Sequence, residues 1–187
     1  MIIETVFSTV DKAGTPNWAP MGVVWGEVEM SVRPFRDTDT YRNLVQTRFG
    51  VANVTDDVLA FARTALSDVA LPCVPANHGP GVILKDACYW RELAVVAVDG
   101  DERRADVRCR VVAEGRQRDF LGFNRGKSAI IEAAIIATRL HLHDRVDVES
   151  AFQRYRDLVR KTGGEQEQKA MQHLEDYVTR WYLAREN

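Results

Sequence analysis

The hydrophobic pattern of this chain changes its period near residue 121, and that change limits the folds that the chain can adopt. Before this point, Ile2–Val10 is rich in β-branched residues, and residues 27–35 (EVEMSVRPF) alternate polar and apolar side chains with the period of two that strands show. After it, residues 126–140 (GKSAIIEAAIIATRL) carry apolar residues at helical spacing. We therefore expect a mixed α+β chain, with antiparallel strands first and helices last.

Local signals mark where individual elements begin and end. The Asp-Gly pair that opens DGDERR (residues 99–104) predicts a hairpin between two long strands. Residues 38–40 (TDT) can cap a short helix that reaches about Gln46, and Gly50 is a stop signal. Further helices are predicted after Thr55 and Asp56, over residues 148–161, and over residues 167–184.

Composition excludes several classes of protein. The formal net charge is -2, and no lysine-rich tail is present, so the sequence offers no broad electrostatic surface for nucleic acid. No stretch approaches the roughly 20 apolar residues of a membrane span, and the N-terminus has no signal-peptide pattern. Cys73, Cys88 and Cys109 lack metal-ligand or CxxC spacing. We expect a cytoplasmic protein with reduced thiols, no membrane contact and no metal site.

The segment RPFRDTDTYRN (residues 33–43) gathers arginines and hydroxyl groups where a strand gives way to a helix. One interpretation is a turn in which Asp37 and Asp39 cap the helix and balance a solvated charge cluster. The other is a site for a single phosphate, because helix N-termini attract anions and guanidinium groups match phosphate geometry. The residues alone leave both interpretations open.

The segment NWAPMG (residues 17–22) places Pro20 inside an apolar strand. Proline cannot donate to a sheet ladder, so it indicates an edge strand or a bulge with backbone groups that are free for another partner. A planar heterocycle such as a flavin could bind to such a backbone, and an edge strand without any ligand is the alternative.

The order of these motifs resembles a known group of proteins. S-T-x4-G-x2-N-x-A-P-M, then R-D-T-x-T-Y-x-N, then G-V-x-N-V is similar to the pattern of flavoredoxin-like and flavin-reductase-like proteins of the FMN-binding split-barrel fold, over residues 5–54. More narrowly, five segments resemble an uncharacterised family of such proteins, a domain of unknown function, from archaea and methylotrophic bacteria: TVDKAGTPNWAPMGV, RPFRDTDTYRNL, NVTDD, NHGPGVILKDACYWREL and FNRGKSAIIEAAIIATRL.

This resemblance implies a fold, a cofactor and a set of site residues. The fold would be a split β-barrel in residues 1–120 that binds FMN, with a C-terminal helical segment, residues 121–187, packed on it. The protein would be a homodimer with FMN near the subunit interface. Tyr41 and Asn43 match the motif and would brace the short helix. The flavin ring would lie against Asn17, Ala19, Pro20 and Met21, and the phosphate would be held by Arg33, Arg36, Thr38 and Thr40.

Three functions follow from this interpretation. The first is a flavin-dependent oxidoreductase with a small-molecule electron donor or acceptor, and the occurrence of the family suggests a link to pterin-dependent one-carbon metabolism. The second is an FMN-binding or electron-carrier module without catalysis. The third is a partner-binding protein that uses its C-terminal helices, around Tyr177 and Trp181.

Other motifs carry weaker signals. GFNRGKS (residues 122–128) lacks Walker A spacing, so we interpret it as a helix start with Asn124 as the cap. The alternative is that Asn124, Arg125 and Lys127 reach the ligand or a second substrate. His78 is either an acid–base group or a solvent-exposed bystander, and Trp90 either core or a cofactor contact. His141 and His143 do not share a helix face, which argues against a metal site. No catalytic side chain can be singled out.

Overall fold

The computed structural model of the protein describes residues 1–186, and its contacts divide the chain into two compact units. One unit comprises Met1–Asp56 and Asp68–Phe120, and the other comprises Asp57–Ser67 together with the chain from Leu121. The division into residues 1–120 and 121–187 stays a prediction from the sequence. In the structure, the short segment Asp57–Ser67 groups with the C-terminal helices.

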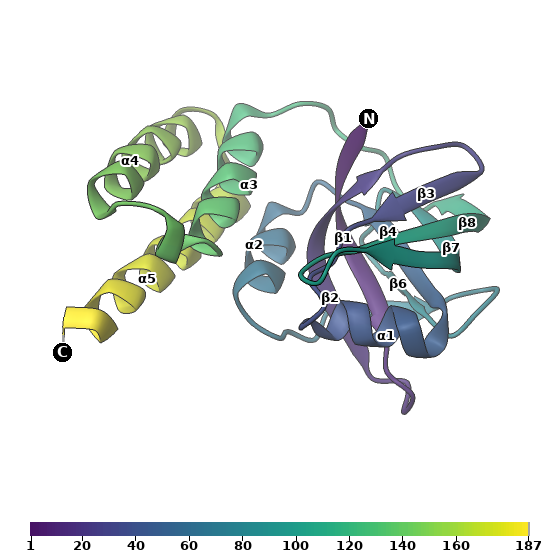
Figure 1. The fold of residues 1–187 in the computed structure, drawn as a ribbon. Helices are drawn as coiled ribbons and strands as arrows, with labels where there is room; N and C mark the ends of the chain where they lie inside the picture. The colour runs from purple at the N-terminus through teal and green to yellow at the C-terminus, as the bar shows by residue number, and fades with distance from the viewer. Residues whose placement is uncertain (187) are drawn as a thin grey trace. The chain divides into compact units, whose positions relative to one another are not determined.

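The first unit is a closed barrel in which every pair of neighbouring strands is antiparallel (Figure 1). The order around the barrel is β1-β2-β3-β8-β7-β4. A separate two-stranded ribbon, β5 (Cys73–Pro75) with β6 (Val82–Leu84), was not predicted. The barrel strands are β1 (Ile2–Val10), β2 (Pro16–Val24), β3 (Glu29–Val32), β4 (Phe49–Val54), β7 (Tyr89–Gly100) and β8 (Ala105–Arg116). The mixed α+β fold expected from the sequence is confirmed.

The barrel encloses an apolar core to which most of its strands contribute. Phe7, Val32 and Leu93 are almost fully buried within it, and each such side chain contributes about 1.5–3 kcal/mol of burial free energy. Gly50 does not end the preceding helix as predicted, since it lies inside β4. A Cβ atom there would come within 2.7 Å of the Phe7 ring, so glycine permits a close approach at this point.

Strand β2 leaves part of the barrel open. It pairs with β1 along its whole length, but with β3 only at Val23 and Val24. The Trp25 N–H donates to the Met1 carbonyl on the β1 side, and backbone groups of alternate residues point to opposite edges of a strand. In the regular register of β2, Pro16 and Pro20 therefore face the open edge, where their missing N–H groups cost no ladder bond.

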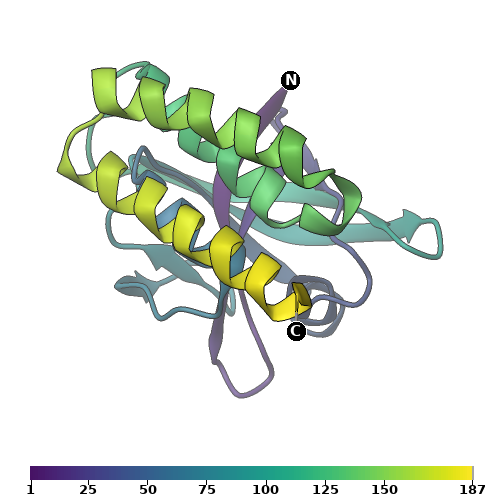
Figure 2. The same ribbon diagram turned by 90° about the vertical axis from the view of Figure 1, so that its left-hand side faces the viewer.

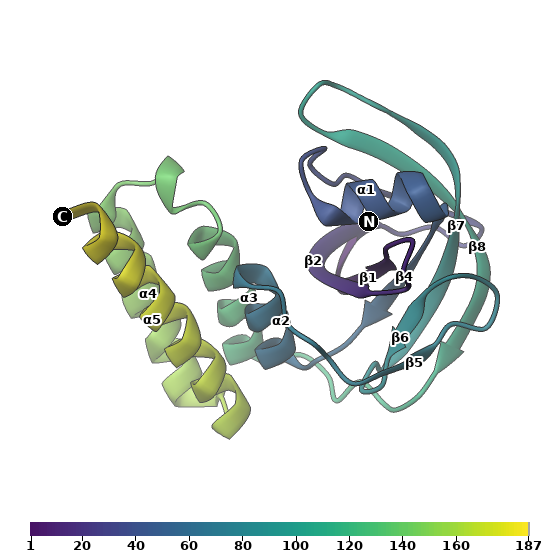
Figure 3. The same ribbon diagram turned by 90° about the horizontal axis from the view of Figure 1, so that it is seen from below.

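Helix α1 (Asp39–Thr47) packs against β1 and β2 (Figure 3). Thr38 caps its N-terminus as predicted, because the Tyr41 N–H donates to the Thr38 hydroxyl. The helix ends at Arg48, which adopts the left-handed conformation with φ of 58°. This short helix brings the segment that precedes it, residues 33–38, into the same unit as the open edge of β2.

The second unit consists of helices. Helix α2 packs against α3 and α5, and α3 against α4, while α4 and α5 run side by side (Figure 2). The apolar stripe predicted for the last helix is partly buried, with Met171 and Leu174 in the core of the unit and Trp181 half-buried. The helices are α2 (Val58–Leu66), α3 (Arg125–Ala137), α4 (Arg145–Thr162) and α5 (Glu165–Glu186), with a 3-10 turn at Leu140–Leu142.

Candidate functional site

The four residues predicted to contact a flavin ring lie together on β2. Asn17, Ala19, Pro20 and Met21 all belong to the part of the strand that has no β3 partner. The side chain of Asn17 donates to the Thr40 hydroxyl at 3.0 Å and to the Thr9 hydroxyl at 3.4 Å. A hydrogen-bond network therefore fixes the start of α1 beside this strand edge.

The two predicted threonines already have protein partners for their hydroxyl groups. Thr38 donates to the Phe35 carbonyl at 2.6 Å and accepts from Tyr41. Thr40 is buried, and its hydroxyl accepts from Asn17. These side chains shape the helix start from the inside, and a ligand would meet the backbone there.

The backbone at the start of α1 offers two donors. The first N–H groups of a helix have no partner within the helix, and those of Asp39 and Thr40 find no acceptor elsewhere among residues 1–186. The Asp39 carboxylate does not turn back onto them, because Arg42 holds it at 2.5 Å. The helix start can therefore receive an anion from outside the chain.

The two predicted arginines differ in their surroundings. Arg33 is exposed at the surface, and its charge acts on Asp101. Arg36 is half-buried, and three of its N–H groups donate to protein acceptors, two of them carbonyls of the β7–β8 hairpin. Of the two arginines, Arg33 is the more exposed residue. Sequence reasoning grouped the two arginines because spacing alone does not reveal the hairpin carbonyls.

The GFNRGKS segment begins α3, and the protein itself supplies the negative charge beside it. Asn124 caps the helix, accepting from the Lys127 N–H at 3.1 Å, as predicted. The Lys127 ammonium lies 3.4 Å from the Glu167 carboxylate, which also accepts from the Gly164 N–H at 2.7 Å. Glu167 is buried. An internal carboxylate thus pairs with the lysine of this segment.

The glycine-rich loop around His78 is anchored on a carboxylate that the sequence analysis missed. Glu92 on β7 is fully buried and accepts from the Asn77 N–H at 2.6 Å and the His78 N–H at 2.8 Å. The His78 Nδ1 lies 3.3 Å from the same carboxylate, while 60% of that side chain is exposed. The signal for Glu92 was present, since it is an acidic residue within the apolar run of a strand.

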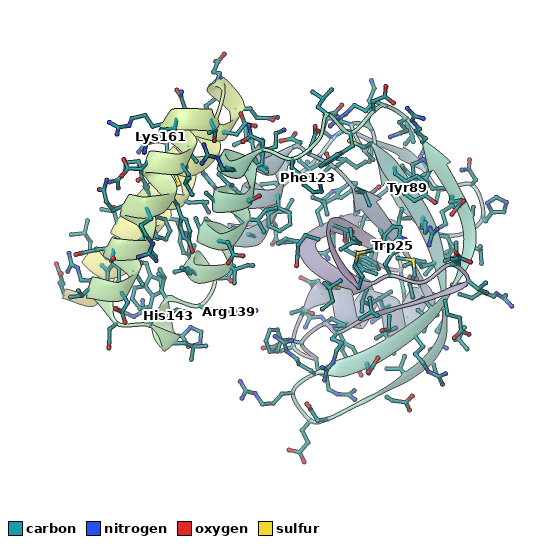
Figure 4. All side chains as sticks on the ribbon, turned by 90° about the horizontal axis from the view of Figure 1, so that it is seen from above. Trp25, Tyr89, Phe123, Arg139, His143 and Lys161 are labelled. Atoms are coloured by element: carbon teal, nitrogen blue, oxygen red, sulfur yellow. The ribbon has the colours of Figure 1, made fainter. Side chains whose placement is uncertain are left out.

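Two other aromatic positions belong to the barrel structure. Trp90 packs in a small core beside Phe49, and its ring covers Gly115, where a Cβ would lie 2.4 Å away. Trp25 and Tyr89 both lie in the barrel (Figure 4), with the Arg91 guanidinium 4.6 Å and 5.6 Å from their ring centres. The partners of Arg91 include the Gly26 carbonyl and Glu114, so these contacts connect β7 with β8 and with the loop after β2.

The remaining sequence candidates form no further site. Cys88 and Cys109 are buried and unoxidised, and burial raises the pKa of the Cys109 thiol to about 12. Within the described part of the chain, no cluster of His, Cys, Asp and Glu has the geometry of a metal site. His143 belongs to the helical unit (Figure 4). Across residues 1–186, no helix has both the length and the apolar character needed to cross a bilayer.

Comparison with solved structures identifies the class of fold. The FMN-bound protein MM1853 from Methanosarcina mazei matches with a TM-score of 0.82 and 26% identity over 94% of each chain. The 2-nitrobenzoate 2-nitroreductase NbaA of Pseudomonas fluorescens matches with a TM-score of 0.54 and 20% identity, over 61% of this chain and 64% of that one. An FMN-binding protein from Thermus thermophilus gives 0.50 and 19%, over 61% and 70%. The fold is that of the FMN-binding split barrels.

The family follows from the sequence match. Residues 3–118 match the N-terminal domain of a protein of unknown function, DUF447, and residues 124–176 match a second region of the same family. The chain therefore belongs to the DUF447 family, and MM1853 carries the same family description. The resemblance inferred from the sequence motifs is confirmed.

Proposed function

We propose that this protein binds FMN and acts as a flavin-dependent oxidoreductase. The observation that carries the proposal is the pairing of an open strand edge with a helix start whose N–H groups have no protein acceptor. Support comes from the 94% coverage shared with the FMN-bound protein MM1853. The neighbour NbaA is a nitroreductase, and another, SgcE6 of Streptomyces globisporus, is an NADH:FAD oxidoreductase.

The strand edge fits the ring of a flavin. In this proposal the ring lies against Asn17, Ala19, Pro20 and Met21, and its polar edge meets backbone groups that face the open edge, such as the Pro20 carbonyl, because the odd-numbered residues of β2 bond to β1. A flavin presents alternating donors and acceptors, which suit unpaired backbone groups. The amide N–H groups of the Asn17 side chain are not available to the ring, because they already donate to the hydroxyls of Thr40 and Thr9. Its role is to hold the strand edge and the helix start at a fixed separation.

The helix start fits a phosphate. In this proposal the Asp39 and Thr40 N–H groups donate to the phosphate oxygens, and Arg33 supplies a full positive charge. Thr38 and Thr40 act through the backbone geometry that their hydroxyl bonds fix. Arg36 stays in the set of predicted phosphate residues, although its donors are partly committed to other acceptors.

The chemistry would come from the cofactor, which can accept and donate electrons when bound. The chain's own residues would bind and orient it, and a small-molecule donor or acceptor would complete the reaction. We also propose a homodimer, supported by the exposed apolar residues Ile2, Val24 and Val28 on the barrel. The reduced cysteines are consistent with a cytoplasmic location. The link to pterin-dependent one-carbon metabolism rests only on the occurrence of the family and stays a prediction from the sequence.

Purified protein tests the proposal directly. We expect titration with FMN to quench flavin fluorescence at a stoichiometry of one per chain, and added NADH or NADPH to be oxidised faster in the presence of an electron acceptor. FMN binding without turnover with either nucleotide would favour the electron-carrier alternative. Absence of FMN binding would overturn the proposal. Light scattering gives the oligomeric state in the same preparation.

A further inference from the structure

The segment that precedes α1 is attached to the distant β7–β8 hairpin. The Ala105 N–H donates to the Pro34 carbonyl at 3.0 Å, and the Arg36 N–H donates to the Arg103 carbonyl at 3.1 Å. Phe35 forms a bridge with Arg104, whose guanidinium lies 4.1 Å from the centre of the Phe35 ring. Residues 34–36 therefore extend the sheet at the tip of the hairpin.

The guanidinium of Arg36 strengthens this attachment with three hydrogen bonds. Its Nε donates to the Asp101 carbonyl at 2.7 Å, and its Nη2 donates to the Asp99 carbonyl at 3.1 Å. Its Nη1 donates to the Tyr41 hydroxyl at 2.6 Å, and the guanidinium also lies 5.2 Å from the centre of the Tyr41 ring. One side chain thus joins the hairpin turn to helix α1.

The turn also has hydrogen bonds of its own. The Asp101 carboxylate accepts from the N–H groups of Arg103 and Arg104 at 2.8 Å and 2.7 Å, and the Asp101 N–H donates to the Arg104 carbonyl. Gly100 has φ of 105°, a conformation that favours glycine. Arg36 therefore connects α1 to a preformed turn, so the position of the helix start follows that of the hairpin.

We propose that Arg36 is a positioning residue of the flavin phosphate site: it fixes the start of α1 against the β7–β8 hairpin and leaves direct neutralisation of the phosphate to Arg33. This inference rests on the proposed FMN binding. The three acceptors of Arg36 lie on two elements, and a planar fork of donors reaches all of them at once. A lysine ammonium is a compact point donor and cannot span the same three acceptors.

Conservative substitutions distinguish positioning from direct contact. Arg36→Ala and Arg36→Lys both remove the planar guanidinium and should each lower FMN affinity about tenfold. Riboflavin affinity should stay nearly unchanged, because only the part of the site that binds the phosphate is displaced. Tyr41→Phe removes one of the three bonds and should lower FMN affinity about threefold. Arg33→Lys should retain most of the affinity, since its charge acts without a fixed fork, whereas Arg33→Ala should not.

Hydrogen exchange on the apoprotein provides a readout that needs no ligand. Arg36→Lys and Tyr41→Phe should speed amide exchange in α1 (Asp39–Thr47) relative to wild type, and Arg33→Ala should leave it unchanged. Melting temperatures of all variants control for general loss of stability, and Tyr41→Phe serves as the gentle variant if the Arg36 variants fold poorly.

The proposal has two clear failures. Arg36→Lys that binds FMN like wild type would make Arg36 a simple charge partner of the phosphate. Faster exchange in α1 with unchanged FMN affinity would make the bonds structural only. Either result overturns the inference. If wild type binds no FMN, the proposed function fails separately, and the exchange experiment still reports whether Arg36 holds α1 to the hairpin.

Discussion

Two helix starts in this protein stand beside basic residues, but they differ in what meets them. At the Gly164 loop before α5, the Glu167 side chain accepts from the backbone and lies beside Lys127, so the chain satisfies its own positive groups. At α1, the nearby Asp39 is drawn away by Arg42, and two N–H groups find no acceptor in the described chain. The first start is closed by the protein, and the second is available to an external anion.

The difference shows why a basic, glycine-containing sequence is a poor guide to anion binding. GFNRGKS contains a lysine, two glycines and a helix start. Its Lys127 nevertheless pairs with a buried glutamate 40 residues further along the chain. RPFRDTDT contains two acidic residues, Asp37 and Asp39, that could balance its helix start, yet Asp39 pairs with Arg42 instead. The arrangement of counter-charges in three dimensions decides which site stays open.

The largest expected effect concerns the closed start. Glu167→Ala should destabilise the protein by about 3 kcal/mol, because it leaves the partly buried Lys127 ammonium without this carboxylate and the Gly164 N–H without its acceptor. Urea denaturation followed by circular dichroism measures the change. Glu165→Ala is the matched control, since that exposed carboxylate pairs with Lys169 in solvent and its loss should cost much less stability. Equal losses of stability in the two variants would mean that burial of Glu167 does not increase its contribution.

The next effect concerns the open start. Arg33→Ala should weaken FMN binding by about 2 kcal/mol through loss of a charge-assisted contact, while riboflavin, which lacks the phosphate, binds as before. Fluorescence titration gives both affinities. Arg110→Ala removes another exposed arginine of the barrel and should change neither value. A parallel loss of riboflavin affinity in Arg33→Ala would place this arginine at the ring and not at the phosphate.

A smaller effect is expected from a variant that gives the start of α1 a counter-charge from its own chain. Arg42→Ala releases the Asp39 carboxylate next to the helix N–H groups, where it competes with a phosphate, and should weaken FMN binding by about 0.5–1 kcal/mol. The double variant Asp39→Asn with Arg42→Ala should regain wild-type affinity. If the double variant stays weak, Arg42 contributes in a way other than holding Asp39.

The smallest effect concerns the hairpin beside the open start. Backbone donation from Arg104 and then Arg103 lowers the pKa of the Asp101 carboxyl below its ordinary value of 3.8. Its contribution is therefore complete above about pH 4 and is lost as pH falls through the lowered folded-state pKa. A titration followed by NMR should give this lowered value, and Asp101→Asn should remove the acid-dependent change in the turn amides. A titration at the ordinary value would show that the turn does not hold the carboxylate.

Much of the fold could be predicted from the sequence because its signals are local. The Asp-Gly pair at 99–100 marks the β7–β8 hairpin, Thr38 and Asn124 cap the helices they precede, and α4 ends at Gly163. The second helix begins slightly later than expected, since Asp57, and not Thr55 or Asp56, accepts from its first N–H groups. Competing cap residues in a row cannot be ranked without knowing their backbone angles.

The site could be predicted only in outline. The sequence predicted the β2 edge through Pro20, and it predicted a phosphate site in residues 33–43 through their donors. It could not show that the acceptors of Arg36 are carbonyls 63 and 65 residues further along the chain, or that Thr40 turns inward to Asn17. Carbonyl groups are common to all residues, so no pattern of side chains reveals them. The roles of individual donors therefore depend on tertiary contacts.

The open stretch of β2 also affects how the protein behaves in a crowded solution. An unpaired strand edge is a template on which another chain can add its own strand, and this is a common route to aggregation. Pro16 and Pro20 both face that edge, and neither offers an N–H for an incoming strand to bond. The residues that keep a recognition surface accessible thus also keep it from joining sheets between molecules.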